Sequence, residues 1–203
     1  MTHFNIYDGS AKEEINYFGN YDIMNLGEII RYNNRAKIRK ENVSEHSFYV
    51  VTNVIKICKA FKIPINIRLE AIELAAVHDI PELFLGDVPY TTKRDNPMLA
   101  EILEQAELNQ LRDNMPEFYE QYNTFIEMEK EGTLQFLIVK LADIISVLQY
   151  SNNEIELGNT SKSMKEINDD AKIRVEIYIH KLKCKLRESY SPVKVDKLPW
   201  IHS

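Results

Sequence analysis

The stretch Phe136–Leu148, "FLIVKLADIISVL", is apolar almost all round a helix, and its only charged residues are Lys140 and Asp143. An apolar helix of this kind is typical of a buried position. The two charges argue against a membrane span, which needs about 20 predominantly apolar residues. Burying an unpaired carboxylate is costly, so Asp143 needs a cation, a network of hydrogen-bond donors or a metal ion. The stretch therefore predicts a buried helix with a charge that has a specific partner.

The composition of the whole chain indicates one helical domain. The 203 residues are enough for one sizeable domain and too few for two ordinary ones. Six glycines and seven prolines are few, and Ile, Leu, Glu, Lys and Ala recur at helical spacings. We expect an all-α, single-domain helical bundle over residues 1–203, with its core at about 25–187 and a C-terminal tail at 188–203.

Apolar spacing places two helices in the first half of the chain. The first is expected from Glu45 to just before Pro64, with Ser44 as its N-cap. The second is expected over 66–79, with Asn66 as its cap. Three of its residues are expected to face inward: Ile72, Ala75 and Ala76.

The segment "LGDVPYTTKRDNP", 85–97, has the Gly, Asp, Pro and Asn residues of a loop and is long enough to line a cleft. Helices are expected again after it. Their ranges are Pro97 to Asn114, Pro116 to Glu131, Leu134 to about Tyr150, and Lys162 to about Arg187.

Charge and cysteine content restrict the partners and the compartment. A formal net charge of -6 argues against binding to nucleic-acid polymers or anionic membranes. One local exception is 31–40, "RYNNRAKIRK", where five basic residues and no acidic one form a patch that attracts anions. Cys58 and Cys184 have no disulfide-framework or zinc-finger spacing. The N-terminus lacks the features of a secretory signal, so we expect a cytoplasmic protein.

Four polar residues occupy positions that helical periodicity makes apolar. His46 opens an apolar stripe, His78 and Asp79 close the second predicted helix, and Asp143 interrupts the buried one. Taken singly, each is more often a surface or hydrogen-bonded residue than a ligand. Two imidazoles and two carboxylates from three helices together form a mixed N/O set, which suits divalent Mn, Fe, Co or Ni, or zinc with an open coordination position.

In their order along the chain, these residues resemble the H…HD…D signature of the HD-domain metal-dependent phosphohydrolases. The flanking segments "ENVSEHS", "HDIPELFLGDVPYTTK" and "KLADII" are similar to the bacterial 5'-deoxynucleotidase (YfbR-like) branch, to which some phage dATP and dNTP triphosphohydrolases are related. The likeness extends from about Arg31 to Ser151 and implies an HD-domain helical bundle.

The resemblance assigns a role to each matching residue. It implies metal ligation by His46, His78, Asp79 and Asp143, so that Asp79 is also part of the catalytic centre. It places the catalytic residue Glu82 next to the attacking water. The implied substrate-binding residues are Arg31 and Lys93 for the phosphate, Asp87 for the deoxyribose, and Tyr32 where the family has tryptophan. Tyr90 and Thr91 replace the family's Thr-Pro, which leaves base preference open.

The implied reaction is metal-dependent hydrolysis of deoxynucleoside 5'-monophosphates to deoxynucleoside and phosphate. The expected cofactor is divalent Mn, Co, Zn or Fe, with Mg less favoured, and the resemblance implies a homo-oligomer, a dimer or higher. One alternative is a deoxynucleoside triphosphate triphosphohydrolase, which shares all the metal ligands. A second is a non-catalytic, nucleotide-binding helical module. Hydrolysis of cyclic nucleotides or alarmones is weaker, because the flanking segments point elsewhere.

Overall fold

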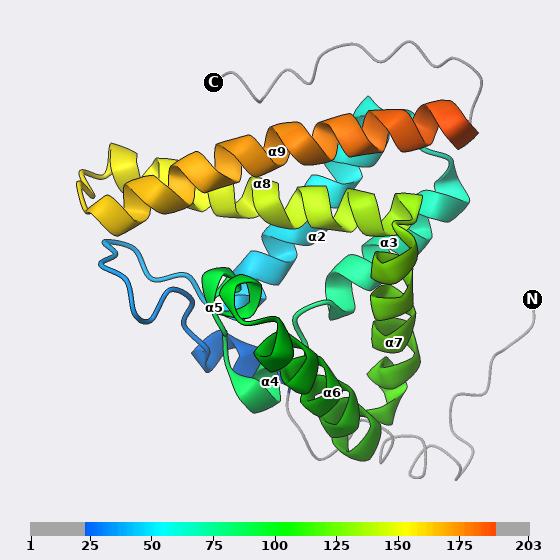
Figure 1. Ribbon diagram of the computed structural model, residues 1–203, viewed down its shortest axis with the longest axis horizontal. Coiled ribbons are helices and arrows are strands. Elements are labelled where there is room, and N and C mark those ends of the chain that lie inside the picture. Colours follow the sequence, from blue (N-terminus) through cyan, green and yellow to red (C-terminus); the bar gives the residue numbers. More distant parts are fainter. Residues whose placement is uncertain (1–22, 190–203) are drawn as a thin grey trace, which may run out of the picture.

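The computed structural model describes residues 23–189, which are mainly helical (Figure 1). The elements are η1 (Ile23–Glu28), α2 (Val43–Ala60), α3 (Ile65–Val77), α4 (Glu82–Leu85), α5 (Tyr90–Asp95), α6 (Pro97–Asn114), α7 (Pro116–Glu131), α8 (Leu134–Glu156) and α9 (Lys162–Ser189). In this part of the chain, the only strand-like pairing is an isolated bridge between Ile30 and Asn42. The all-α prediction is confirmed.

Helix α8 forms the centre of the fold. It packs against α9 along its length and against α2 and α3 on its other side (Figure 1). Ile138, Leu141 and Ile144 have no exposed surface. By length and composition alone α8 could cross a membrane, but 67% of the apolar 18-residue stretch that meets this criterion is buried within the fold. Its hydropathy is thus accounted for by the protein core, as the sequence predicted.

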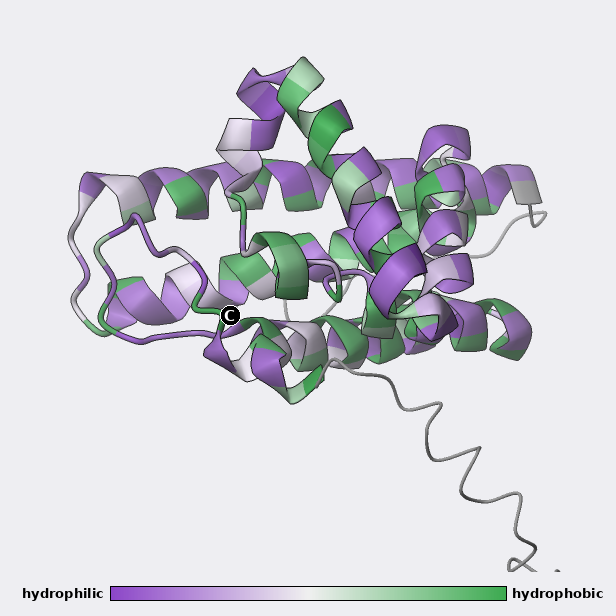
Figure 2. Ribbon diagram, turned by 90° about the horizontal axis from the view of Figure 1, so that it is seen from below, coloured by the Kyte–Doolittle hydropathy of each residue, from purple (hydrophilic) through white to green (hydrophobic). Residues whose placement is uncertain are grey.

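The outer helices are amphipathic, and Figure 2 shows apolar and polar residues alternating along them. Helix α9 buries a stripe at helical spacing against α8, which includes Met164, Ala171, Val175, Leu182 and Leu186. The intervening residues are mostly exposed and polar. This pattern explains why α9 covers α8 and presents a charged outer face.

Two apolar clusters make up the core, and the candidate site lies where they meet. The larger cluster is built from α2, α3, α8 and α9, and the smaller one joins α6 and α7 to the residues around Val43 and Val77. Along α2, Val43 belongs to the smaller cluster and Val50 to the larger. His46 is between these two positions and is only 1% exposed. The packing of both clusters therefore fixes the turn that carries His46.

The start of α2 differs from the prediction. The helix begins at Val43 and its N-cap is Asn42, whose side chain accepts a hydrogen bond from the Glu45 backbone N–H at 2.8 Å. Glu45 in turn accepts from the Asn42 backbone N–H at 3.4 Å. This reciprocal capping box satisfies two backbone donors that would otherwise lack helical partners. Ser44 is therefore inside the helix, and its assignment as the cap was wrong.

Helix α3 also departs from its predicted details. Its N-cap position is Pro64, with no side-chain capping bond, so the assignment of Asn66 was wrong. Ala75 is buried and Ile72 is partly buried, as expected, but Ala76 is exposed. The regular helix ends at Val77, before the predicted end at 79.

Elsewhere the predicted ranges are largely correct. Helices α6 and α7 have the expected limits, and α9 ends close to the expected residue. Helix α8 continues to Glu156, six residues beyond the expected end. The segment 85–97 is not entirely a loop, because α5 forms within it. The predicted C-terminal tail is outside the described residues from 190 onward.

Candidate active site

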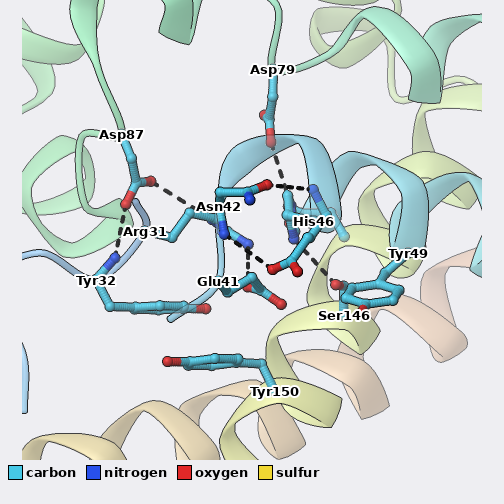
Figure 3. Close-up of polar contacts among 12 residues, drawn as sticks. Arg31, Tyr32, Glu41, Asn42, His46, Tyr49, Asp79, Asp87, Ser146 and Tyr150 are labelled. Carbon is cyan, nitrogen blue, oxygen red and sulfur yellow. Dashed lines mark hydrogen bonds and ion pairs between the residues drawn. The ribbon is translucent and has the colours of Figure 1, made fainter. Parts of the chain in front are cut away.

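Three helices bring the candidate metal ligands together. His46 is on the first turns of α2, His78 and Asp79 directly follow α3, and Asp143 is midway along α8. The Asp79 Oδ2 atom is 3.2 Å from His78 Nε2 and 3.4 Å from His46 Nε2. Ligand atoms of His46, His78 and Asp79 all lie within 4.8 Å of one another. Figure 3 shows Asp79 and His46 facing each other at the centre of the site.

The hydrogen bond of His78 defines which ring nitrogen can bind a cation. Its Nδ1 is 2.8 Å from the carbonyl oxygen of Ala75, which can only accept, so Nδ1 carries the proton. In the neutral ring, Nε2 therefore presents a lone pair. Among the described residues this buried Nε2 has no hydrogen-bond partner, although Asp79 Oδ2 is 3.2 Å away. Two electron-rich atoms facing each other at that distance fit a bound cation between them.

The protonation state of His46 fits the same role. Burial lowers the pKa of His46, so the neutral imidazole is favoured at neutral pH. Its Nδ1 is 3.2 Å from Ser146 Oγ on α8, and its Nε2 faces Asp79 and Asp143. His46, His78 and Asp79 thus have the donor chemistry that a divalent transition-metal ion requires.

Asp143 joins this group through His46, with Oδ1 at 3.3 Å from His46 Nε2. Its other oxygen, Oδ2, is 2.9 Å from the ammonium of Lys140, one turn earlier on α8. Burial alone would raise the pKa of Asp143, but Lys140 and His46 hold that pKa well below its usual range. The sequence required a partner for Asp143, and Lys140 is a partner that the sequence reasoning did not assign. Its spacing of three residues on one helix was the available signal.

Glu82 is the first residue of α4, three residues after the candidate metal ligand Asp79. Its backbone N–H donates to the Asp79 carbonyl at 3.1 Å, which fixes the turn between them. Its Oε2 is buried and has no hydrogen-bond partner among residues 23–189. Burial, with the negative charges of Asp79 and Asp87, raises the pKa of Glu82 well above its usual value. A carboxyl group with a raised pKa is a stronger base than an exposed one, which suits proton transfer.

Arg31, a predicted phosphate residue, lies between two carboxylates, Glu41 and Asp87 (Figure 3). One terminal nitrogen is 3.3 Å from Glu41 Oε2, and its Nε is 3.9 Å from Asp87 Oδ1. Asp87 Oδ2 also accepts a hydrogen bond from the Tyr32 backbone N–H at 3.1 Å. Glu41 is 1% exposed and was not among the predicted site residues. The structure thus brings three predicted substrate residues, Arg31, Tyr32 and Asp87, into one network.

Tyr32 is held by stacking. Its ring lies 4.8 Å from the ring of Tyr150, with only 4° between their planes (Figure 3). Its backbone has a φ of 56°, in the left-handed region that is uncommon for residues other than glycine. The Tyr32 hydroxyl is buried and, within the described part of the chain, has no hydrogen-bond partner.

The end of α8 anchors the segment that carries Arg31 and Tyr32. Glu154 has no exposed surface, and its carboxylate accepts from the backbone N–H groups of Ile38 and Arg39 at 2.7 and 2.6 Å. Asn159 donates to the same carboxylate at 2.7 Å and to the Ala36 carbonyl at 3.0 Å. No helical or strand periodicity in the sequence signals the contacts with Ala36, Ile38 and Arg39, because they join positions more than 100 residues apart.

Lys93, the other predicted phosphate residue, is held by α6. Its ammonium is 2.9 Å from Oε1 of Glu107, a carboxylate on α6 that is only 7% exposed as a residue. Tyr122 of α7 donates to Glu107 Oε2 at 2.5 Å. Lys93 is thus tied to the smaller core cluster, while its charge still acts on Glu82.

A cavity of about 360 Å³ opens beside Arg31 and Tyr32. Its walls come from the 31–35 segment, the 87–94 segment, Val147 of α8 and the first half of α9. Small-molecule sites in proteins typically enclose about 300–1,000 Å³. The cavity therefore has room for a nucleoside. The four candidate metal ligands do not line it, and Arg31, which does line it and whose charge acts on Asp79, connects the two.

Comparisons with known proteins show which family the chain resembles. A family model described as "5'-deoxynucleotidase YfbR-like" matches residues 17–190. The 5'-deoxynucleotidase of Photobacterium profundum is 31% identical over 154 residues, which cover 72% of this chain and 78% of that protein.

Solved structures share the fold. An HD-domain phosphohydrolase from Listeria innocua superposes with a TM-score of 0.67 and 24% identity, over 89% of this chain and 87% of that one. The cyanophage S-2L HD phosphohydrolase DatZ, bound to dA and one catalytic Zn²⁺ ion, gives a TM-score of 0.59 at 19% identity, over 84% of this chain and 95% of that one. The predicted HD-domain bundle is confirmed, as is the resemblance on which it was based.

Proposed function

The chain belongs to the YfbR-like 5'-deoxynucleotidase family of HD-domain phosphohydrolases, and we propose that it hydrolyses deoxynucleoside 5'-monophosphates to deoxynucleoside and phosphate. The carrying observation is the pair of electron-rich atoms, His78 Nε2 and Asp79 Oδ2, that face each other at 3.2 Å. Arg31, whose charge acts on Asp79, also lines a cavity of nucleoside size. This pairing suits a cation-dependent reaction on a ligand bound in that cavity.

We propose that His46, His78, Asp79 and Asp143 hold one divalent ion. Once bound, such an ion activates water and polarises a phosphoryl oxygen. Mn, Co, Zn or Fe suits the two imidazoles and two carboxylates, whereas Mg prefers oxygen ligands alone. The Zn²⁺ of the cyanophage enzyme, which shares this fold, supports zinc as a first candidate.

The remaining residues bind the substrate and move the proton. Arg31, whose Nε has no hydrogen-bond partner within residues 23–189, binds the phosphate with help from Lys93. Asp87 accepts a hydrogen bond from the deoxyribose, and Tyr32 forms the adjacent wall. Glu82 accepts a proton from the attacking water as the water oxygen bonds to phosphorus. The bond from phosphorus to O5' then breaks, and the leaving oxygen takes up a proton.

The two alternatives are less well supported. The curated relatives are 5'-deoxynucleotidases, which favours monophosphates over triphosphates as substrates. A non-catalytic module would not need a carboxylate next to the candidate metal ligands whose buried Oε2 has no hydrogen-bond partner among residues 23–189, as in Glu82.

Phosphate release from deoxynucleotides tests the proposal. Protein stripped with EDTA and reloaded with Zn, Mn, Co or Mg is assayed on deoxy- and ribonucleoside mono- and triphosphates, with Asp79→Ala as the blank. Asp113→Ala, which changes an exposed carboxylate on α6, is the matched control. We expect inorganic phosphate from deoxynucleoside monophosphates with the wild type and the control, and none with Asp79→Ala. Tripolyphosphate as the product, or no turnover with metal demonstrably bound, would contradict the proposal.

We further propose a cytoplasmic homo-oligomer, at least a dimer. A reducing compartment is supported by Cys58 and Cys184, which are both free thiols in the described structure. Association is supported by large apolar side chains that are exposed on α6, with Met98 at 79% and Ile102 at 63%. Light scattering on the purified protein tests the oligomer, and a monomer at micromolar concentration would contradict it.

A further inference from the structure

Glu107 of α6 is a buried carboxylate that has no role in the proposed reaction. Glu107 and Leu111 are the buried residues of α6, and their spacing of four places them on one face of the helix. Leu111 belongs to the smaller core cluster. The Glu107 position therefore lies on the apolar face that packs α6 into the protein, where an uncompensated carboxylate costs free energy.

Both oxygens of this carboxylate have a partner. Oε1 is 2.9 Å from the ammonium of Lys93 on α5, and Oε2 accepts the hydrogen bond of the Tyr122 hydroxyl on α7 at 2.5 Å. Replacing a buried ion pair by apolar residues often leaves stability unchanged or raises it. Stability alone therefore does not explain why a charged pair is present here.

The pair with Glu107 determines where the Lys93 ammonium lies. Helix α5 has only six residues and packs mainly on α6. In this position Lys93 opposes the rise that burial causes in the pKa of Glu82. In the same network, burial and the charge of Glu107 raise the pKa of Tyr122, and the charge of Asp79 adds to that rise. The network thus borders the residues that are proposed to accept the proton of the attacking water and to hold the metal ion.

A lysine that is already held binds an anion at a lower entropic cost. Its long side chain loses rotamer freedom when a ligand fixes it, and a partner that fixes the ammonium beforehand removes part of this cost. Of the three N–H donors of Lys93, Glu107 uses one, which leaves two for an anion. The Lys93 side chain is 36% exposed, so a ligand can reach it. We propose that Glu107 is a positioning residue, which holds the Lys93 ammonium where it binds the phosphate of the substrate. This inference rests on the proposed function, which assigns Lys93 to the phosphate.

Binding of the two products separates the phosphate from the nucleoside. Inorganic phosphate and the four deoxynucleosides are titrated into the zinc-loaded protein by calorimetry. In Glu107→Gln, whose amide keeps the side-chain volume and can still accept from Tyr122, we expect the Kd of phosphate to rise roughly fivefold to tenfold. The Kd of the deoxynucleosides should not change. KM for deoxynucleoside monophosphates should rise in the same variant, by more than kcat falls.

The Lys93→Met background shows whether Glu107 acts through Lys93. There, Glu107→Gln should cause no further rise in the Kd of phosphate, because the two changes remove one interaction. Glu107→Asp keeps the charge but withdraws it by one methylene, so it should show a smaller selective loss, and it decides the question if Glu107→Gln does not fold. The matched control is Glu104→Gln, at a partly exposed carboxylate of α6 that also pairs with a lysine, Lys130 at 3.2 Å. It should keep the wild-type Kd of phosphate.

Each outcome decides one claim. If deoxynucleoside monophosphates are hydrolysed but Glu107→Gln leaves the Kd of phosphate unchanged, or weakens phosphate and deoxynucleosides equally, this inference fails and the nucleotidase proposal stands. A loss that persists in full in the Lys93→Met background also overturns it, as does a wild-type protein that does not bind phosphate. If no monophosphate is hydrolysed, the nucleotidase proposal fails, and the Kd of phosphate in the same variants still decides the inference.

Discussion

The two halves of the candidate site are held in place by different forces. His46, His78, Asp79 and Asp143 are on or directly after long helices, whose apolar faces are buried in the core. Arg31, Tyr32 and Asp87 are on the segments 31–41 and 86–95, which contain no helix longer than the six residues of α5. Individual hydrogen bonds and ion pairs hold these two segments. Packing therefore fixes the candidate metal ligands, while a few polar contacts and the stacking of Tyr32 on Tyr150 fix the predicted substrate residues.

The largest expected effect follows from changing one of the four candidate metal ligands. Asp143→Asn removes a charge next to His46 without disturbing the apolar contacts of α8. We expect kcat/KM to fall roughly a thousandfold, since metal ions supply several kcal/mol of transition-state stabilisation. The affinity for Zn²⁺, measured by chelator competition, should fall as well, while the circular dichroism spectrum stays helical.

A matched control for that variant is Asp169→Asn on α9. Asp169 also has a lysine three residues away, Lys172, but it is 74% exposed and far from the ligand group in the chain. It should retain wild-type activity and metal affinity. Wild-type metal affinity in Asp143→Asn would show that Asp143 is not a ligand.

The next largest effect should come from releasing the 31–41 segment. Glu154→Gln places an amide N–H₂ where the carboxylate now accepts three short hydrogen bonds. Hydrogen bonds to charged groups contribute about 1.5–3 kcal/mol, so we expect the free energy of unfolding to fall by about 2 kcal/mol. KM should rise more than kcat falls, because Arg31 and Tyr32 lose their anchor. Urea unfolding and steady-state kinetics measure both.

Glu156→Gln, two residues further on the same helix at an exposed position, is the control. It should behave as the wild type in both measurements. An unchanged KM in a destabilised Glu154→Gln protein would mean that the anchor serves folding alone.

A smaller effect is expected where the 86–95 segment begins. Gly86 has φ 74° and ψ 170°, a region of backbone space that is essentially restricted to glycine. An added Cβ meets no described heavy atom within 4 Å, so Gly86→Ala strains only the backbone. We expect a loss of about 1–2 kcal/mol in unfolding free energy and a higher KM through displacement of Asp87. Gly27→Ala is the control, since its Cβ would be at an ordinary 3.9 Å from Ser44 Oγ. Equal losses in both variants would contradict the explanation.

The smallest effect is a pH dependence at Glu41. Burial raises the pKa of Glu41 to about 7, although Arg31 opposes this. A carboxyl with a raised pKa in the folded state adds stability that is complete below its unfolded value of about 4.5 and is lost as the pH rises through about 7. Unfolding free energy should therefore decline between pH 5 and 8, by on the order of 1–2 kcal/mol.

Glu41→Gln should flatten this decline, and Glu131→Gln, at an exposed position, should not. Urea titrations at several pH values measure the slope. A slope that is identical in Glu41→Gln and the wild type would assign the pH dependence to another group.

The candidate metal ligands could be found from the sequence because they break a periodic pattern. His46 is buried and Asp143 is partly buried, each in a helical stretch that is otherwise apolar, and the family resemblance joined them to His78 and Asp79. Their ligand role stays a prediction, which Asp143→Asn and Asp79→Ala test. The start of α2 was misplaced because the prediction put the cap at Ser44, although Glu45 is three residues after Asn42 and no Glu or Gln is three residues after Ser44. The contact of Glu45 with Asn42 identifies Asn42 as the cap.

The sequence by itself determined the all-α class, most helix limits, the family and the residues that could hold a metal ion, because these depend on local periodicity and on motifs. Only the tertiary structure decided the partners of the charged groups, such as Lys140 for Asp143, Glu107 for Lys93 and Glu154 for the 31–41 segment. The contact between Arg174 of α9 and the Tyr90 ring also required the tertiary structure. Most of these contacts join residues that are distant in the chain, and Lys140 depends on which face of α8 is buried. The helical pattern determines on which face of a helix a side chain lies, and the packing of the helices determines which residues that side chain contacts.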